Sequence, residues 1–254
     1  MFYLDLLSSA IEHAAWYCPN PECERKGNTG NYCGGCTYPA PWRKEAFQTV
    51  GNIVRFGHYE QDDNLENGQE EIEWIVLDVQ DGKSLLISKN GLDVKPYNTS
   101  YTSVTWETCT LKSWLNNDFL EVAFSVEEQS TILEAKVDDK KSQGFSEYST
   151  NGGNNSHDQI FLLSYYEVFD LFFMNNDARK GITTDYAETL VRYKSNSIKV
   201  DGRATRLCWL RSPGSVLRQA LIVDLDGTKS YQPVDGDSVC VRPAFWINLE
   251  TDIF

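Results

Sequence analysis

The segment from Trp209 to Ile247 constrains the fold more than any other part of the chain. It opens on Trp-Leu-Arg-Ser-Pro-Gly (209–214) and closes on Val-Arg-Pro-Ala-Phe-Trp-Ile (241–247). Between these ends polar and apolar residues stand side by side, and Asp226-Gly227 marks a turn. Short apolar runs separated by Pro-Gly and Asp-Gly predict strands joined by tight turns. We expect a rigid frame that displays a changeable surface.

Strand patterns lie mostly toward the two ends of the main part of the chain, with helical patterns between them. The expected strands are residues 53–59, 72–76, 85–88, 160–163, 209–211, 220–225, 228–231, 239–241 and 245–247. A helical stripe runs from Leu111 to Phe119, and Ser125/Glu128 and Ser164/Glu167 form capping boxes that mark helix starts. Residues 142–158, rich in Gly, Asn and Ser, are expected to form a surface loop. The sequence therefore predicts an α+β fold.

Length and charge limit the domain count and the classes of partner. A chain of 254 residues can hold one main domain and a small appendage. The net charge of −14 repels phosphate backbones and anionic lipid, so we expect neither nucleic acid nor membrane as a partner. The start of the chain lacks the pattern of a secretory signal, and no apolar run is long enough to span a bilayer.

Two cysteine pairs near the start suggest a metal site. Cys18 and Cys23 are separated by four residues, Cys33 and Cys36 by two. Four thiolates on facing knuckles suit a structural Zn²⁺ site and leave no open position for catalysis. Redox chemistry at Cys33 and Cys36 is the alternative, but these residues do not follow a strand at a helix start. The segment resembles the short zinc ribbons of many bacterial cytoplasmic proteins, although their usual first gap is two residues.

The other three cysteines, Cys109, Cys208 and Cys240, are scattered. With seven cysteines in total, an odd number, the pattern is not a disulfide framework. A reducing, cytoplasmic compartment is therefore expected.

The predicted organisation has three parts. Residues 1–17 carry apolar positions at three- and four-residue steps and are expected to form an amphipathic helix, which packs on its own protein or serves oligomerisation or docking. Residues 18–45 hold the zinc ribbon and a linker that includes Pro39, Pro41 and the charged stretch from Arg43 to Glu45. Residues 49–254 form the main, ligand-binding domain.

Ten fragments in order, from about residue 53 to 249, resemble a bacterial family common in gut Firmicutes and their phages. They are Phe56-Gly57-His58-Tyr59, Glu73-Trp74-Ile75-Val76-Leu77, Leu85-Leu86-Ile87-Ser88, Thr105-Trp106-Glu107-Thr108, Trp114-Leu115-Asn116, Ala123-Phe124-Ser125, Ile160-Phe161-Leu162-Leu163-Ser164, Asp185-Tyr186-Ala187, 209–214 and 241–244. That family looks like the C-type lectin fold in its formylglycine-generating-enzyme-like form.

Some members of this family resemble the variable proteins of diversity-generating retroelements. In those systems a reverse transcriptase copies a template with errors at adenines, and the changed codons fall in the C-terminal segment that displays a ligand surface. The resemblance implies a non-enzymatic protein that binds an unknown protein or other macromolecule. The alternative is an undiversified interaction or signalling module that makes one fixed contact.

The resemblance places the ligand surface between Arg206 and Val239. The residues assigned to it are Arg206, Cys208, Val216, Leu217, Arg218, Gln219, Leu221, Lys229, Tyr231, Gln232, Pro233 and Val234. Family members commonly have many Asn and Ser here, whereas no Asn occurs in residues 197–247, and Cys208 stands where an aromatic residue is frequent. Diversification and ordinary drift both predict such departures. Arg218, Tyr231 and Gln232 offer the chemistry of binding hot spots; Val216, Leu217 and Leu221 are either exposed anchors or core-facing strand residues.

The frame residues have structural roles whatever the function. We expect Arg211 and Arg242 to form bidentate bonds to backbone carbonyls or a buried carboxylate, with Trp209 and Trp246 filling the core beside them.

Enzyme chemistry has little support in the sequence. His13, His58 and His157 are dispersed, and none lies in a metal or nucleophile motif. An oxidase is the weaker alternative, suggested by a comparison of Cys208 and Cys240 with the copper-binding thiols of formylglycine-generating enzymes. These two cysteines stand 32 residues apart in the sequence, which argues against that comparison. The acidic runs at 62–63 and 235–237 lack the ligand spacing of a known calcium loop, so solvated turns are expected there.

Overall fold

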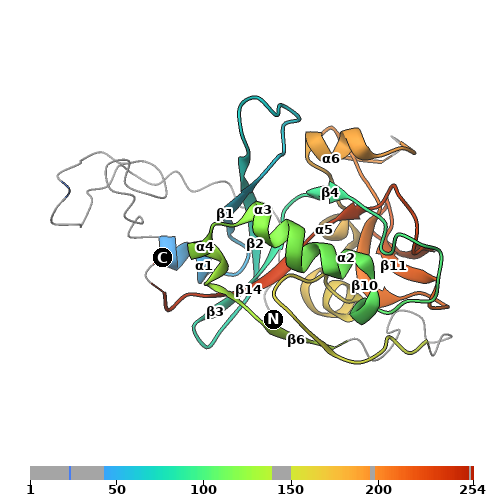
Figure 1. Ribbon diagram of the computed structural model, residues 1–254. Coiled ribbons are helices and arrows are strands. Elements are labelled where there is room, and N and C mark those ends of the chain that lie inside the picture. Colours follow the sequence, from blue (N-terminus) through green and yellow to red (C-terminus); the bar gives the residue numbers. More distant parts are fainter. Residues whose placement is uncertain (1–22, 24–42, 139–149, 195–197, 252) are drawn as a thin grey trace.

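Two five-stranded sheets organise the part of the chain that the structure describes (Figure 1). The computed structural model describes residues 23, 43–138, 150–194, 198–251 and 253–254. The first sheet has the order β1-β2-β3-β14-β5 and is antiparallel throughout. Its strands are β1 (Ile53–Tyr59), β2 (Glu70–Gln80), β3 (Lys83–Ser88), β14 (Ala244–Asn248) and β5 (Ile132–Leu133).

The second sheet carries most of the segment after residue 206 and has the order β12-β11-β10-β13-β4. Its strands are β12 (Lys229–Pro233), β11 (Gln219–Val223), β10 (Cys208–Pro213), β13 (Cys240–Val241) and β4 (Asp93–Val94). Strands β10 and β13 are parallel, and the other neighbours are antiparallel. Strand β12 lies at the edge, where the missing N–H of Pro233 and the charge of Lys229 discourage further pairing.

Two short connections between the sheets lie at one junction. Strand β13 leads through Arg242 and Pro243 into β14, and β3 leads through residues 89–92 to β4. The N–H of Ser88 donates to the Pro243 carbonyl at 2.9 Å, which holds the two crossings together. The side chains of both sheets belong to one hydrophobic core.

Helices and small strand pairs surround the sheets. They are α1 (Arg43–Phe47), η1 (Trp106–Thr108), α2 (Thr110–Trp114), η2 (Leu115–Phe119), α3 (Leu120–Ala123), α4 (Val126–Gln129), η3 (Glu167–Phe172), α5 (Asn176–Arg179), α6 (Asp185–Leu190), and the hairpins β6 (Ala135–Val137)/β7 (Ser156–Asp158) and β8 (Lys199–Val200)/β9 (Arg203–Ala204). The predicted α+β class is confirmed. No helix within the described residues is long and apolar enough to cross a membrane.

Local sequence rules account for several of these elements. Asp81 and Gly82 both have positive φ, 49° and 71°, which is the backbone of the tight β2–β3 hairpin. At the start of α4, Glu128 N–H donates to Ser125 Oγ at 3.2 Å and Ser125 N–H donates to Glu128 Oε2 at 2.9 Å. Ser164 and Glu167 make the same reciprocal pair. The predicted capping boxes are therefore confirmed.

Aromatic side chains fill the core behind the first sheet. Trp74 is fully buried, donates Nε1 to the Phe56 carbonyl at 2.6 Å and meets the Phe245 ring edge to face at 4.7 Å. Gly57 has a φ of +70°, and a Cβ there would lie 2.6 Å from the Phe124 ring. Glycine at this bulge in β1 is required both by the backbone and by the ring packed against it.

Three expectations about local structure are wrong. Residues 160–163 are buried but form only an isolated bridge, Phe161 to Ala244, because β14 already pairs along both edges with β3 and β5. Ser156–Asp158, placed in a loop, is a strand paired with β6. Arg43–Phe47, placed partly in the linker, is a helix whose Phe47 ring packs on Phe254 at 4.8 Å, so the folded domain begins at or before residue 43.

The predicted helix at 1–17 lies outside the described residues. So do Cys18, Cys33 and Cys36 of the predicted zinc site, whereas Cys23 is described and partly exposed.

Candidate ligand-binding surface

The frame of the second sheet is fixed by buried polar contacts. Arg211 of β10 binds both carboxylate oxygens of Glu167, with Nη2 to Oε1 at 3.1 Å, and donates to the Leu162 carbonyl at 2.9 Å. Trp209 is buried and donates Nε1 to the Lys95 carbonyl at 2.8 Å. These contacts confirm the structural roles expected of both residues. Trp246, expected in the core, is only half-buried and packs against the Lys83 ammonium at 5.0 Å.

The loop from Gly214 to Gln219 is held in one conformation by its backbone. Gly214 N–H donates to the Gln219 carbonyl at 2.8 Å, and Gln219 N–H donates to the Val216 carbonyl at 2.9 Å. The Leu217 and Arg218 carbonyls accept from Val104 N–H and Val234 N–H, both at 3.0 Å. Side chains on this loop therefore project from a backbone that hydrogen bonds within the protein hold in place.

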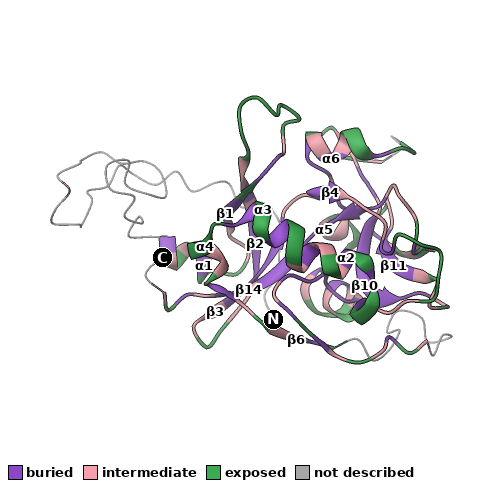
Figure 2. Cartoon of the chain, in the orientation of Figure 1, coloured by how far each residue is buried: buried purple, intermediate pink, exposed green. Residues whose placement is uncertain are grey.

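Eight of the twelve predicted surface residues are exposed or half-buried, and we call them the display surface. They are Val216, Leu217, Arg218, Gln219, Lys229, Tyr231, Gln232 and Pro233. In β12 the exposed positions alternate, because Lys229, Tyr231 and Pro233 point away from the core while the intervening residues are half-buried. The neighbouring strands β10 and β11 are mostly buried (Figure 2). None of the eight is acidic, in contrast to the chain's net charge of −14.

The other four predicted surface residues are buried, and their assignment to the surface is corrected. Leu221 and Val234 have no exposed area: Leu221 lies on β11, between β10 and β12, Val234 directly follows β12, and both side chains belong to the hydrophobic core. Arg206 and Cys208 are each 3% exposed. A ligand at the display surface does not reach these side chains in this conformation.

Two aromatic residues that are not among the twelve predicted surface residues lie beside the display surface. The Arg218 guanidinium stands 5.2 Å from the centroid of the half-exposed Tyr101 ring. The Lys229 ammonium stands 5.3 Å from the Tyr165 ring, which in turn stacks on Phe169 at 4.8 Å. Tyr101 and Tyr165 lie far from this segment in sequence, and no local pattern marks them as its neighbours.

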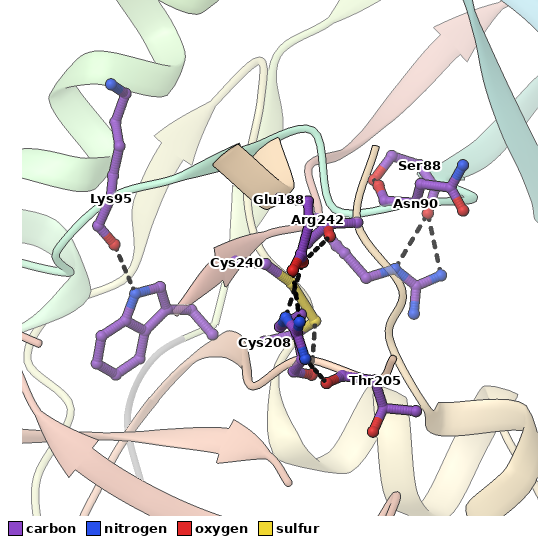
Figure 3. Close-up of a disulfide and its surroundings, with 11 residues drawn as sticks. Ser88, Asn90, Lys95, Glu188, Thr205, Cys208, Cys240 and Arg242 are labelled. Carbon is purple, nitrogen blue, oxygen red and sulfur yellow. Dashed lines mark hydrogen bonds and ion pairs between the residues drawn. A yellow bond between two sulfur atoms is a disulfide. The ribbon is translucent and has the colours of Figure 1, made fainter. Parts of the chain in front are cut away.

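A second feature of this sheet is the disulfide between Cys208 of β10 and Cys240 of β13 (Figure 3). The parallel pairing of β10 with β13 places the two residues directly opposite each other, with a Cα–Cα distance of 4.6 Å. Their separation of 32 in sequence therefore does not keep them apart, and the prediction that no disulfide framework exists misses this bond. Disulfides are rare in the cytosol, so the bond weighs against the expected compartment.

Two glycines make room for this disulfide. A Cβ on Gly91 would lie 2.7 Å from the Cys240 sulfur, and a Cβ on Gly181 would lie 2.2 Å from the Cys208 sulfur. Real Cβ atoms do not approach so closely, so any larger residue at either position displaces the disulfide.

Arg206 is fixed next to the disulfide by an ion pair. Its Nε and Nη2 donate to the two oxygens of Glu188 at 2.8 and 2.5 Å. Partial burial raises the pKa of Glu188, but the hydrogen bonds and charge of Arg206 outweigh it and leave that pKa below its usual value. Arg206 is thus a structural residue of the frame.

The acidic and histidine positions considered for chemistry are separate. Oxygens of Glu60, Asp62 and Glu70 lie within 4.8 Å of one another, but Asp62 accepts from Asn64 N–H and Asn67 Nδ2 as in a solvated turn. Asp237 pairs with Arg192 at 2.6 Å. His58 and His157 are exposed and lie in different sheets.

One comparison with known proteins gave a match. The family described as "Domain of unknown function (DUF6273)" matches residues 81–249, which is more than half of the chain and spans both sheets from β3 onward. No curated protein and no solved structure matched the chain.

Proposed function

Because the chain belongs to the DUF6273 family, whose description names no activity, we propose its function from the geometry of the second sheet: it is a non-enzymatic protein that binds a macromolecular ligand at the display surface. The observation that carries this proposal is the loop 214–219, whose backbone is held by hydrogen bonds within the loop and to Val104 and Val234, while Val216 and Arg218 are exposed. Preorganised backbone lowers the entropic cost of binding.

The composition of the surface supports a protein ligand. Arg218, Tyr231 and the neighbouring Tyr101 provide a cation and two aromatic rings, the side chains enriched at binding hot spots. Val216, 46% exposed, adds apolar area. The acid-free display surface favours a partner with acidic or neutral groups over a basic one.

We further propose that the domain is a C-type-lectin-like domain whose surface is diversified by a retroelement. The proposal is supported by the resemblance of the ten fragments and by the division of residues 206–247 into buried frame and exposed positions. The alternative is a fixed interaction module. The buried frame would serve either role equally well.

Sequencing codons 205–248 in a population of the source cells, with a search of the flanking DNA for a near-repeat, separates these alternatives. Diversification predicts substitutions concentrated at the display surface, at positions where the repeat has adenine, with Trp209, Arg211 and Arg242 unchanged. An invariant segment without a nearby repeat contradicts diversification and leaves the fixed module.

We also propose that Cys18, Cys23, Cys33 and Cys36 hold a structural Zn²⁺, since four thiolates match its preferred ligand set. Metal analysis under reducing conditions at neutral pH should find about one zinc per chain, lost in Cys33→Ser. Cys109→Ser, outside the pairs, is the matched control. A metal-free wild-type protein contradicts the site.

A further inference from the structure

Three arginines of the C-terminal segment are buried, and one of them differs from the others in its partners. Arg206 and Arg211 each bind both oxygens of a glutamate, Glu188 and Glu167. Arg242, 9% exposed, donates Nε and Nη2 to the Ser88 carbonyl at 3.2 and 3.0 Å. No carboxylate among the described residues pairs with it.

The third nitrogen of this guanidinium is directed away from Ser88. Figure 3 shows both dashed lines of Arg242 running to Ser88 from two nitrogens, while Nη1 points to the other side. Arg242 lines a small cavity together with the Cys208 half of the disulfide, Leu210, Val223 and Arg179. The guanidinium of Arg179 is held by the Phe173 carbonyl at 3.0 Å and by Asn176 Oδ1 at 2.9 Å.

The cavity is therefore lined by two cations and no carboxylate. Its volume of about 20 Å³ holds one water molecule or one ion of similar size.

Electrostatics favours an anion over water at this position. Burial lowers the pKa of Arg242 to about 10, so the group is still protonated at neutral pH. A buried charge without a counter-charge is strongly destabilising, and the neutral Ser88 carbonyl does not cancel it. A small anion beside Nη1 supplies the missing charge.

We propose that the cavity between Arg242 and the Cys208–Cys240 disulfide binds one monatomic anion, chloride under ordinary conditions. The anion completes the junction of the two sheets in the way that Glu188 and Glu167 complete the sites of Arg206 and Arg211. The inference does not depend on what the display surface binds.

Urea unfolding at constant ionic strength, with sodium chloride replaced stepwise by sodium gluconate, tests the site. Above the dissociation constant, each tenfold rise in chloride should raise the folded-to-unfolded ratio of the wild type about tenfold. Arg242→Met should abolish this dependence. Arg218→Met, which removes the same charge from an exposed position, should retain it. No chloride dependence in the wild type, or an equal dependence in Arg242→Met, overturns the proposal.

A second measurement keeps the proposal testable if Arg242→Met does not fold. Wild-type crystals grown in sodium bromide should show an anomalous scattering peak within hydrogen-bonding distance of the Arg242 guanidinium. A cavity that contains only water, or a peak at other sites alone, overturns it.

Discussion

The Arg218 guanidinium lies over the ring of Tyr101, 5.2 Å from its centroid. This contact joins the loop 214–219 to the segment before η1. The Arg218 and Tyr101 side chains are both exposed and accessible to a ligand. We expect Arg218→Ala and Tyr101→Ala each to change stability little, with a coupling of about 0.5–1 kcal/mol in a double-mutant cycle by urea unfolding. Tyr166→Ala, at a similarly exposed ring, is the control partner and should show no coupling to Arg218. Equal coupling to both tyrosines contradicts the contact.

Truncation of paired positions on β11 and β12 should destabilise the protein to very different extents. Leu221 and Tyr231 are register partners, but Leu221 has no exposed area while Tyr231 is 39% exposed. Leu221→Ala should lower the unfolding free energy by about 2–5 kcal/mol because it leaves a cavity. Tyr231→Ala should cost much less. Denaturant unfolding of the two variants measures this, and similar losses contradict the burial assigned to β11.

The disulfide should contribute measurably to stability. Closing a loop of 32 residues is worth about 3–4 kcal/mol in the chain-entropy account. The Cys208→Ser/Cys240→Ser double variant should lose about this amount relative to the oxidised wild type. Reduction of the wild type with dithiothreitol should lower it toward the same value. A free-thiol assay that finds both cysteines reactive in unreduced, denatured protein would contradict the bond.

Gly181→Ala should be destabilising because of one sulfur atom. The added Cβ would lie 2.2 Å from the Cys208 sulfur, whereas its next neighbours, the Arg206 carbonyl and the Cys208 Cβ, are at 3.5 and 3.7 Å. The same substitution in a Cys208→Ala background should therefore be tolerated. Thermal unfolding of the four variants in this cycle measures the rescue, and an unchanged cost in both backgrounds contradicts the clash.

The Arg206–Glu188 pair predicts a specific loss of stability in acid. The folded protein holds the pKa of Glu188 below its usual value of 4.5, so the carboxylate contributes stability above that pH. The contribution is lost as pH falls through the lower, folded-state pKa. Unfolding free energies measured from pH 7 to 3 should fall more steeply for the wild type than for Glu188→Gln. Parallel curves would show that the pair does not link folding to pH.

Local sequence patterns predicted those parts of the fold that depend on neighbouring residues. The strand pattern at residues 53–59 gave β1 with its observed bounds, and the spacing of Ser125 and Glu128 gave a helix start. The predicted strands after residue 208 are all present within a few residues. The Asp226-Gly227 turn is longer than the expected two residues, because Asp224 and Thr228 close it by a hydrogen bond of 2.7 Å.

Features that depend on distant segments could not be predicted in this way. The apolar run in β11 does not tell whether both of its faces are covered, so Leu221 was assigned to the surface. The parallel β10–β13 pairing, which joins Cys208 to Cys240, has no local signal. Tyr101 lies beside the display surface in a segment that is joined to it by the hydrogen bond from Val104 N–H to the Leu217 carbonyl. The same limit explains why Arg242 was expected at a carbonyl or a carboxylate, without a choice between them.

The claim that a rigid frame carries a changeable surface is tested most directly by saturation mutagenesis of residues 205–248, with protease resistance as the measure of folding. The account predicts that most substitutions at Val216, Lys229, Tyr231 and Pro233 change stability by less than about 0.5 kcal/mol. Substitutions at Arg211, Leu221 and Val234 should remove most of the folded protein. Equal sensitivity at the two sets of positions would contradict the division between frame and surface.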